Sequence, residues 1–93
     1  MTPVIFRKWK SGEVIALFPQ DPGTNDPATC MSYMHIGQHS AAHPDKVVSK
    51  TRAATEQEYH ALLCELTAIG YDLQIRKIIS RHDYALRQLE IYG

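Results

Sequence analysis

The chain has 93 residues, of which 44% are hydrophobic and 22% are charged, and these proportions are typical of a single folded domain over residues 1–93. Ten basic and ten acidic residues cancel, so no overall field concentrates nucleic acid or anionic lipid around the molecule, and any such binding has to be local. No apolar run is long enough for a signal peptide or a membrane-spanning helix, and we expect a cytoplasmic protein that makes no contact with a membrane.

Residues 4–18, VIFRKWKSGEVIALF, predict a β-hairpin, because β-branched and aromatic residues flank a Ser-Gly turn. If Lys10 paired with Glu13, each face would mix charged and apolar groups. If Trp9 pairs with Glu13 instead, with Gly12 in a left-handed bulge, one face is apolar except for a lysine near the tip. We prefer this second register. Its apolar face carries Val4, Phe6, Val14, Ala16 and Phe18.

The opposite face of the hairpin is too apolar for plain solvent surface, so we expect either a second layer or a partner to cover part of it. If a partner covers it, Trp9 and Ile15 are exposed in the free chain. This outer face carries Ile5, Arg7, Trp9, Glu13, Ile15 and Leu17.

The middle of the chain alternates between loops and short predicted strands. Residues 19–28, PQDPGTNDPA, hold three prolines and a glycine, which predict a surface loop where no strand or helix continues. Residues 29–36, TCMSYMHI, alternate as a strand of the same sheet, which Gly37 ends. We interpret residues 38–45, QHSAAHPD, as one helical turn or a structured loop, and residues 46–53, KVVSKTRA, as a further strand.

A helix over residues 56–69 has the clearest start and end in the sequence. Thr55 and Glu58 form a T-x-x-E capping box, and leucines recur at helical spacing after it. Gly70 is expected to stop the helix in a left-handed conformation, with Tyr71 folding back in a Schellman-type closure.

The last quarter of the chain predicts a strand and then an ambiguous segment. Residues 71–80, YDLQIRKIIS, alternate as a strand with Leu73, Ile75 and Ile79 on one side. The remaining stretch, RHDYALRQLEIYG, contains RQLEIY, which alternates like a strand. We favour a helix here, begun by Ser80 and Asp83 and using Ala85, Leu86 and Leu89.

Strands in a run followed by one strong helix predict an α+β fold. We expect a small, mostly antiparallel sheet of four to five strands, with one main α-helix packed on one face.

Three histidines, His35, His39 and His43, lie four residues apart in SYMHIGQHSAAH. On one helix they would share a face and suit a metal ion. The strand pattern before them and Pro44 after them oppose a continuous helix, so we favour histidines hydrogen-bonded at a strand end and on a loop. A second interpretation is a small-molecule or peptide pocket that uses the first two histidines together with Tyr33.

The two cysteines, Cys30 and Cys64, lie far apart and form no C-x-x-C pair, so neither a disulfide framework nor a zinc knuckle is indicated. We expect both to be reduced and packed in the core. No nucleophile, P-loop or dinucleotide motif is present, and we assign no catalytic residue, metal or cofactor.

The stretch FRKWK interleaves aromatic and basic residues, as do sheets that bind single-stranded nucleic acid. Two further basic groups, expected on strands, could join it in a local patch, but we favour the interpretation that these are solvated outer-face residues of edge strands. These groups are Lys46, Lys50 and Arg52, and Arg76, Lys77 and Arg81.

Three stretches stand out together: VIFRKWKSGEVIALFP, CMSYMHIGQHSAA and EYHALLCELTAIGYDL. They resemble a group of short uncharacterised proteins encoded in bacterial prophages, conjugative elements and related mobile DNA. The resemblance covers the chain up to about Arg76, and SYMHIGQH is its most specific part. It implies a cytoplasmic accessory protein of a mobile element, in an adaptor, inhibitor or DNA-maintenance role.

Our leading hypothesis is a non-enzymatic interaction module that binds a protein partner or a second copy of itself. The contact residues would be Arg7 and Trp9 on the outer face of the hairpin, with Tyr33, His35 and His39 at the adjacent turn. Two alternatives belong to other classes. One is single-stranded nucleic-acid binding through the basic and aromatic sheet face, and the other is a histidine- or metal-assisted enzyme.

Overall fold

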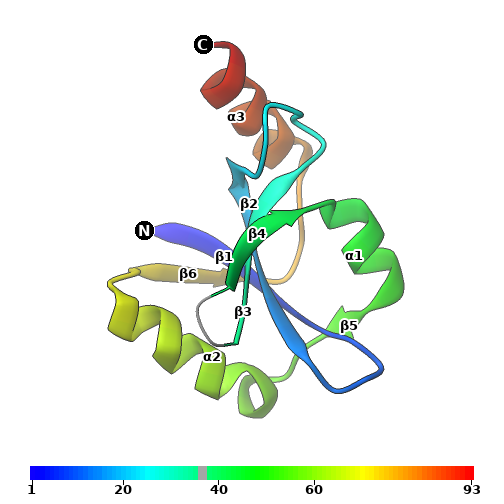
Figure 1. Cartoon of the computed structure of the whole chain (residues 1–93), viewed down its shortest axis with the longest axis vertical. Helices are drawn as coiled ribbons and strands as arrows, with labels where there is room; N and C mark the ends of the chain where they lie inside the picture. The colour runs from blue at the N-terminus through cyan, green and yellow to red at the C-terminus, as the bar shows by residue number, and fades with distance from the viewer. Residues whose placement is uncertain (36–37) are drawn as a thin grey trace.

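The computed structural model describes residues 1–35 and 38–93. In this part of the chain it contains six strands and three helices (Figure 1). The predicted α+β class is confirmed, and the structure adds a helix over residues 44–50 to the main helix and the favoured C-terminal helix. The elements are β1 (Thr2–Lys8), β2 (Val14–Pro22), β3 (Cys30–Met34), β4 (Gln38–Ala42), α1 (Pro44–Lys50), β5 (Arg52–Ala53), α2 (Glu56–Ile69), β6 (Leu73–Arg76) and α3 (Arg81–Tyr92).

The strands form one sheet in the order β4-β3-β2-β1-β5, and β6 also pairs with β1. The pairing of β6 with β1 is parallel, and the other pairs are antiparallel. Strand β5 pairs with the end of β1 and β6 with its beginning, so the two short strands lie along one side of β1. Strand β4 therefore forms one edge of the sheet, and β5 and β6 form the other.

The hairpin register that the apolar pattern predicts is confirmed. Phe6 lies opposite Ala16, and the backbone N–H of Trp9 donates to the carbonyl of Glu13 over 2.9 Å. Gly12 has a φ of +100°, a left-handed backbone conformation that costs glycine little.

Helices cover both faces of this sheet. On one face α2 packs Leu62 and Leu66 against the apolar side of the hairpin, and the ring of Tyr59 stacks on Phe6 with centroids 4.4 Å apart. On the other face Val47 of α1 packs on a second cluster that contains Ile5, Ile15, Leu17 and Cys30. A second layer thus covers the outer face of the hairpin. The expectation that Ile15 is exposed is wrong, since only 4% of it is accessible, and Trp9 is half-buried.

Two predicted loop segments contain strand instead. Strand β2 continues through Pro19 as far as Pro22, because an irregularity in its pairing with β3 between Phe18 and Pro22 absorbs the prolines. Residues 38–42 form β4 beside β3, and neither a helical turn nor a loop, since the small side chains of Ser40, Ala41 and Ala42 also fit an edge strand. Ile36 and Gly37, where we expected β3 to end, lie outside the described residues.

The strand predicted over residues 46–53 is also wrong. Residues 44–50 form α1, which begins with Pro44 at a position where helices tolerate proline, and β5 contains Arg52 and Ala53 alone. Two adjacent valines suggest a strand, but only Val47 is buried and Val48 is exposed, as a single amphipathic turn requires.

The C-terminal strand is shorter than predicted. Strand β6 ends at Arg76, and the predicted shared side of its apolar residues is wrong. Leu73 packs against the cluster that contains Leu62 and Leu66 of α2. Ile79 packs against the second cluster, on the other face, while Ile75 is exposed. The chain crosses from one face of the sheet to the other after β6, and no strand periodicity describes such a crossing.

Both helical ends that the sequence predicts are confirmed. Thr55 and Glu58 form a reciprocal capping box at the start of α2, and the N–H of Tyr71 closes its end on the carbonyl of Leu66. Helix α3 begins with a second capping box, but its buried face differs from the predicted one. Ala85 and Leu89 are exposed, and the fully buried side chains are Asp83 and Arg87.

Buried charge, and not apolar packing, attaches α3 to the sheet. Arg76 donates to both oxygens of Asp83, with nitrogen to oxygen distances of 2.8 and 2.9 Å, and Gln20 of β2 donates to the same carboxylate. Arg87 donates to the backbone carbonyls of Pro19 and Pro27. Polar contacts thus join α3 to the end of β2 and to the loop that follows it.

Replacing Thr55 by Ala should lower the free energy of unfolding by about 1 kcal/mol, because the side-chain cap of the Glu58 N–H is lost. Chemical denaturation measures the change. Thr55→Ser is the matched control, since its hydroxyl can still accept this hydrogen bond. Equal destabilisation by both variants would contradict the assigned cap.

The Asp83 carboxylate should make the stability of the fold depend on acid pH. Burial raises its pKa, but hydrogen bonds from Arg76, from the Ser80 backbone and from Gln20 outweigh this and lower the pKa to about 2. An unfolded aspartate has a pKa of about 3.9. Because the folded-state value is lower, about 2 to 3 kcal/mol of stability is present above pH ~4 and is lost as the pH falls through 2.

Urea denaturation of the wild type and Asp83→Asn at pH 7 and near pH 2 measures this contribution. We expect the wild type to be the more stable at pH 7 and the two proteins to converge in acid. Asp45→Asn, which removes an exposed carboxylate, should show a much smaller difference. A difference for Asp83→Asn that is the same at both pH values would contradict the assignment.

Candidate binding surface around Trp9

Trp9 follows β1 at the end of the hairpin, and the confirmed register directs it to the α1 face of the sheet. Its side chain packs against the second cluster and remains half-buried. In the described part of the chain, three hollows share Trp9 and Lys50. We call them the Trp9 surface. The largest has a volume of about 600 Å³ and is lined by Lys8, Trp9, Lys10, Ser49, Lys50, Thr51 and Arg52.

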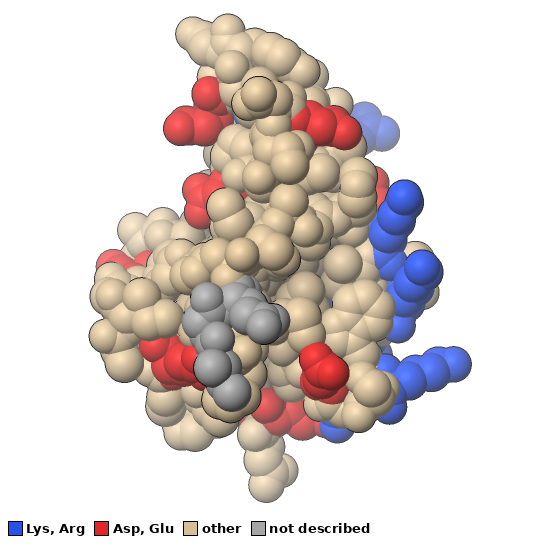
Figure 2. Space-filling view, in the orientation of Figure 1, with Lys and Arg blue, Asp and Glu red and all other residues tan. Residues whose placement is uncertain are grey.

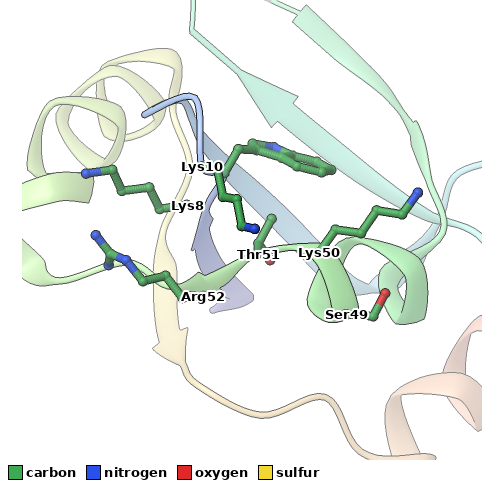
Figure 3. Close-up of a pocket in the computed structure, with 7 residues that line it drawn as sticks. Lys8, Lys10, Ser49, Lys50, Thr51 and Arg52 are labelled. Carbon is green, nitrogen blue, oxygen red and sulfur yellow. The ribbon is translucent and has the colours of Figure 1, made fainter.

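Two of the cations at this surface are neutralised by α2. Figure 3 shows the side chains of Lys8 and Arg52 extending to the same side. Both pair there with the carboxylate of Glu58, at 2.5 and 2.6 Å. Hydrogen bonds from Arg52 and then Lys8 hold the pKa of Glu58 well below its usual range. The carboxylate of Glu58 therefore neutralises Lys8 and Arg52 and links the hairpin, β5 and the start of α2.

Three lysines at the Trp9 surface lack such compensation. Lys10, Lys46 and Lys50 form no ion pair with any other residue that the structure describes. Lys50 extends away from Lys8 and Arg52 in Figure 3. The surface therefore carries local positive charge although the whole chain is neutral.

The charge distribution over one side of the molecule agrees with this. Lysine and arginine side chains gather along the right-hand side of Figure 2, where Figure 1 places α1 and β5. Most acidic side chains in the same view lie elsewhere. Glu13, near the tip of the hairpin, lines one of the three hollows and is an exception.

The smallest hollow, with a volume of about 310 Å³, extends from Trp9 across the sheet toward β4. Ile15, Ser32, Ser40, Ala41 and Ala42 line it from the strands. Lys46, Val47 and Lys50 line it from α1. The two lysines are one helical turn apart, so they lie on the same side of α1. We predicted them on a strand, and this placement is wrong.

Arg7, a predicted contact residue, supports the surface from beneath. Its guanidinium donates to the backbone carbonyls of Val48 and Thr51 and to the Thr51 hydroxyl, at distances of 3.1, 2.6 and 3.0 Å. These acceptors lie at the C-terminal end of α1, where carbonyls lack helical partners. Arg7 therefore positions α1, while Trp9 lines the surface itself.

The structure brings Tyr33, His35 and His39 together, and α2 completes the group. The buried Tyr33 hydroxyl donates to one oxygen of Glu65 over 2.5 Å, and Nδ1 of His35 lies 2.8 Å from the other. His39 packs edge-on against the Tyr33 ring, with Nε2 2.9 Å from the Tyr71 hydroxyl. This network lies on the α2 face, opposite Trp9, and ties the β3–β4 hairpin to α2.

Metal-binding geometry is not found among the described residues. His43 lies between β4 and α1, whereas His39 lies within β4 and His35 follows β3. No group of three or more His, Cys, Asp or Glu side chains within residues 1–35 and 38–93 could hold a metal ion.

The two cysteines have different environments. Cys30 is buried as predicted, and burial raises the pKa of its thiol to about 11, which disfavours the reactive thiolate. The prediction that Cys64 packs in the core is wrong. It lies on the exposed side of α2, one position beyond the apolar stripe, with its sulfur 3.5 Å from Nε2 of His60.

The second predicted basic group does not join the Trp9 surface. Arg76 is committed to the buried Asp83, while Lys77 and Arg81 line a separate hollow between α1 and α3. The FRKWK stretch included Lys10, but sequence reasoning missed Ser40, Ala41 and Ala42 as lining residues. The i, i+4 spacing of Lys46 and Lys50 after Pro44 was the available signal that α1 is a helix.

No protein-family model, curated protein or solved structure matches this chain. No helix within the described residues has the length and apolar character needed to cross a membrane.

If the Tyr33 network is structural, removing its hydroxyl should destabilise the fold. We expect Tyr33→Phe to lower the free energy of unfolding by about 2 kcal/mol, because a buried hydrogen bond to a carboxylate is lost. His35→Ala should cost less than about 1 kcal/mol, since His35 is largely exposed. Thermal or urea unfolding compares the two. A Tyr33→Phe variant as stable as the wild type would contradict this role.

Proposed function

We propose that this chain binds single-stranded nucleic acid at the Trp9 surface, with a base stacked on Trp9 and phosphates contacted by Lys10, Lys46 and Lys50. The observation that carries the proposal is the half-buried tryptophan shared by three hollows and surrounded by lysines that lack acidic partners. Base stacking on an aromatic ring and lysine contacts to phosphates are the two interactions by which proteins bind single strands without sequence preference.

The packing of the surface favours this chemistry. Trp9 is already ordered against the second cluster, so stacking on it costs little side-chain entropy. Lysine ammonium groups are point charges on flexible stems, which can follow a phosphate backbone of variable geometry. The open hollows do not enclose a compact ligand, and they continue from β5 across to β4.

The sequence resemblance adds a cellular context to the proposal. A DNA-maintenance role in a mobile element is among the roles that it implies, and nucleic-acid binding is the activity such a role requires. The protein-partner hypothesis has less support, because α1 covers the apolar outer face that it relied on and Ile15 is buried. We therefore propose a non-enzymatic nucleic-acid-binding accessory protein.

Titration with an oligothymidylate of about 12 nucleotides tests the proposal. Trp9 is the only tryptophan of the chain, so its intrinsic fluorescence reports on stacking directly. We expect quenching on binding, and Trp9→Ala should weaken binding measured by anisotropy by about 5- to 150-fold, equivalent to 1–3 kcal/mol.

The salt dependence provides a second readout. Lys50→Ala should reduce the slope of log affinity against log salt by about 0.7, as expected for one lost phosphate contact. Lys77→Ala removes the same charge outside the Trp9 surface and should leave the slope unchanged. The proposal fails if Trp9→Ala binds as tightly as the wild type, or if both lysine variants behave alike.

A further inference from the structure

Strand β4 is a sheet edge without the features that usually protect such edges. Among the described residues it is hydrogen-bonded on one side only, to β3, and the pairing runs without a bulge from Gln38 to Ala42. Its sequence, QHSAA, contains no proline, lysine or other permanently charged residue. His39, Ser40 and Ala41 are exposed. Natural edges are commonly blocked by charge, proline, bulges or short length.

The other edge of the sheet is protected by these means. Strand β5 has only two residues, one of which is Arg52, and β6 has four and ends in Arg76. An added strand would meet short, charged partners there. In Figure 1, β4 lies in front of the other strands, and no helix is drawn over it. We therefore expect a strand that joins this sheet to pair with β4.

We infer that β4 pairs antiparallel with β4 of a second copy, so that two sheets join into one. Pairing of all five residues places Ser40 opposite its own counterpart, with the two-fold axis between them. A second copy fits this edge because a strand without permanently charged side chains faces no like-charge repulsion from itself. The zero net charge of the chain also removes long-range repulsion between copies.

The symmetry has a consequence for the Trp9 surface. A two-fold axis between antiparallel strands is perpendicular to the sheet, so both copies present their α1 faces on the same side. The hollow that runs from Trp9 to Ser40 and Ala42 then meets its counterpart at the joined edge. This combined surface rests on the proposed function, whereas the strand pairing stands without it.

Cysteine crosslinking tests the pairing. Ser40→Cys in a Cys64→Ser background should form a disulfide-linked dimer on mild oxidation, because directly opposed residues in antiparallel strands have Cα atoms about 4.5–5.5 Å apart. Ser49→Cys in the same background is the control, since Ser49 is exposed on α1 and is not part of β4. Equal crosslinking of the two variants would overturn the proposal.

Light scattering gives an independent measurement. The wild type should have the mass of a dimer, and Ala41→Lys, which puts a charge on the edge, should have that of a monomer. A monomeric wild type at about 100 µM, or a dimeric Ala41→Lys, would overturn the pairing. Ala41 borders the hollow that runs from Trp9 to β4, but its side chain is directed to the α2 face, because Ala41 pairs with Met31, which packs against the cluster of Leu62 and Leu66.

The nucleic-acid titration separates the two proposals. If both hold, oligothymidylate long enough to span two copies binds the wild type more tightly than a short one, and Ala41→Lys loses this length dependence while its Trp9 quenching remains. A dimeric wild type that shows no Trp9 quenching contradicts the proposed function but not the pairing. Quenching by a monomeric wild type contradicts the pairing alone.

Discussion

The register of the β1–β2 hairpin is the constraint on which the rest of the structure depends. Because successive side chains of a strand point to opposite faces, a slip of one residue would exchange the two apolar sets and direct Trp9 to the α2 face. The contact of the Trp9 N–H with the Glu13 carbonyl, with Gly12 in the left-handed region, prevents this. Both helical layers, and the position of the candidate binding surface, follow from that single alignment.

The basic residues that pair with carboxylates inside the fold differ from the lysines that give the Trp9 surface its positive charge. Glu58 caps α2 and also neutralises Lys8 and Arg52, while Asp83 holds Arg76 in the interior. The basic residues without such a partner at the hairpin and on α1 are lysines, whose flexible stems suit contact with a polyanion. A chain of zero net charge can therefore present a basic surface, because its carboxylates are used elsewhere.

Part of the candidate site could be read from the sequence. The FRKWK pattern indicated a local basic and aromatic surface, and Trp9 lies at its centre. Arg7 was placed on the correct face, but its role depends on α1. The adjacent Val47 and Val48 favoured a strand there, so the helix was not predicted. Tyr33, His35 and His39 do converge, yet the group that organises two of them is Glu65, thirty residues away along the chain. No local pattern connects residues at that separation.

The sequence by itself determined the features that arise from local chemistry: the hairpin and its register, both capping boxes, and the left-handed glycine that ends α2. Each depends on hydrogen bonds or backbone preferences within a few residues. The tertiary structure alone decided that residues 38–42 form an edge strand, that residues 44–50 form a helix, and that α3 buries Asp83 and Arg87 and not its leucines. In these segments the local preferences are weak or conflicting, so long-range partners such as β3, the outer face of the hairpin and the loop after β2 set the outcome.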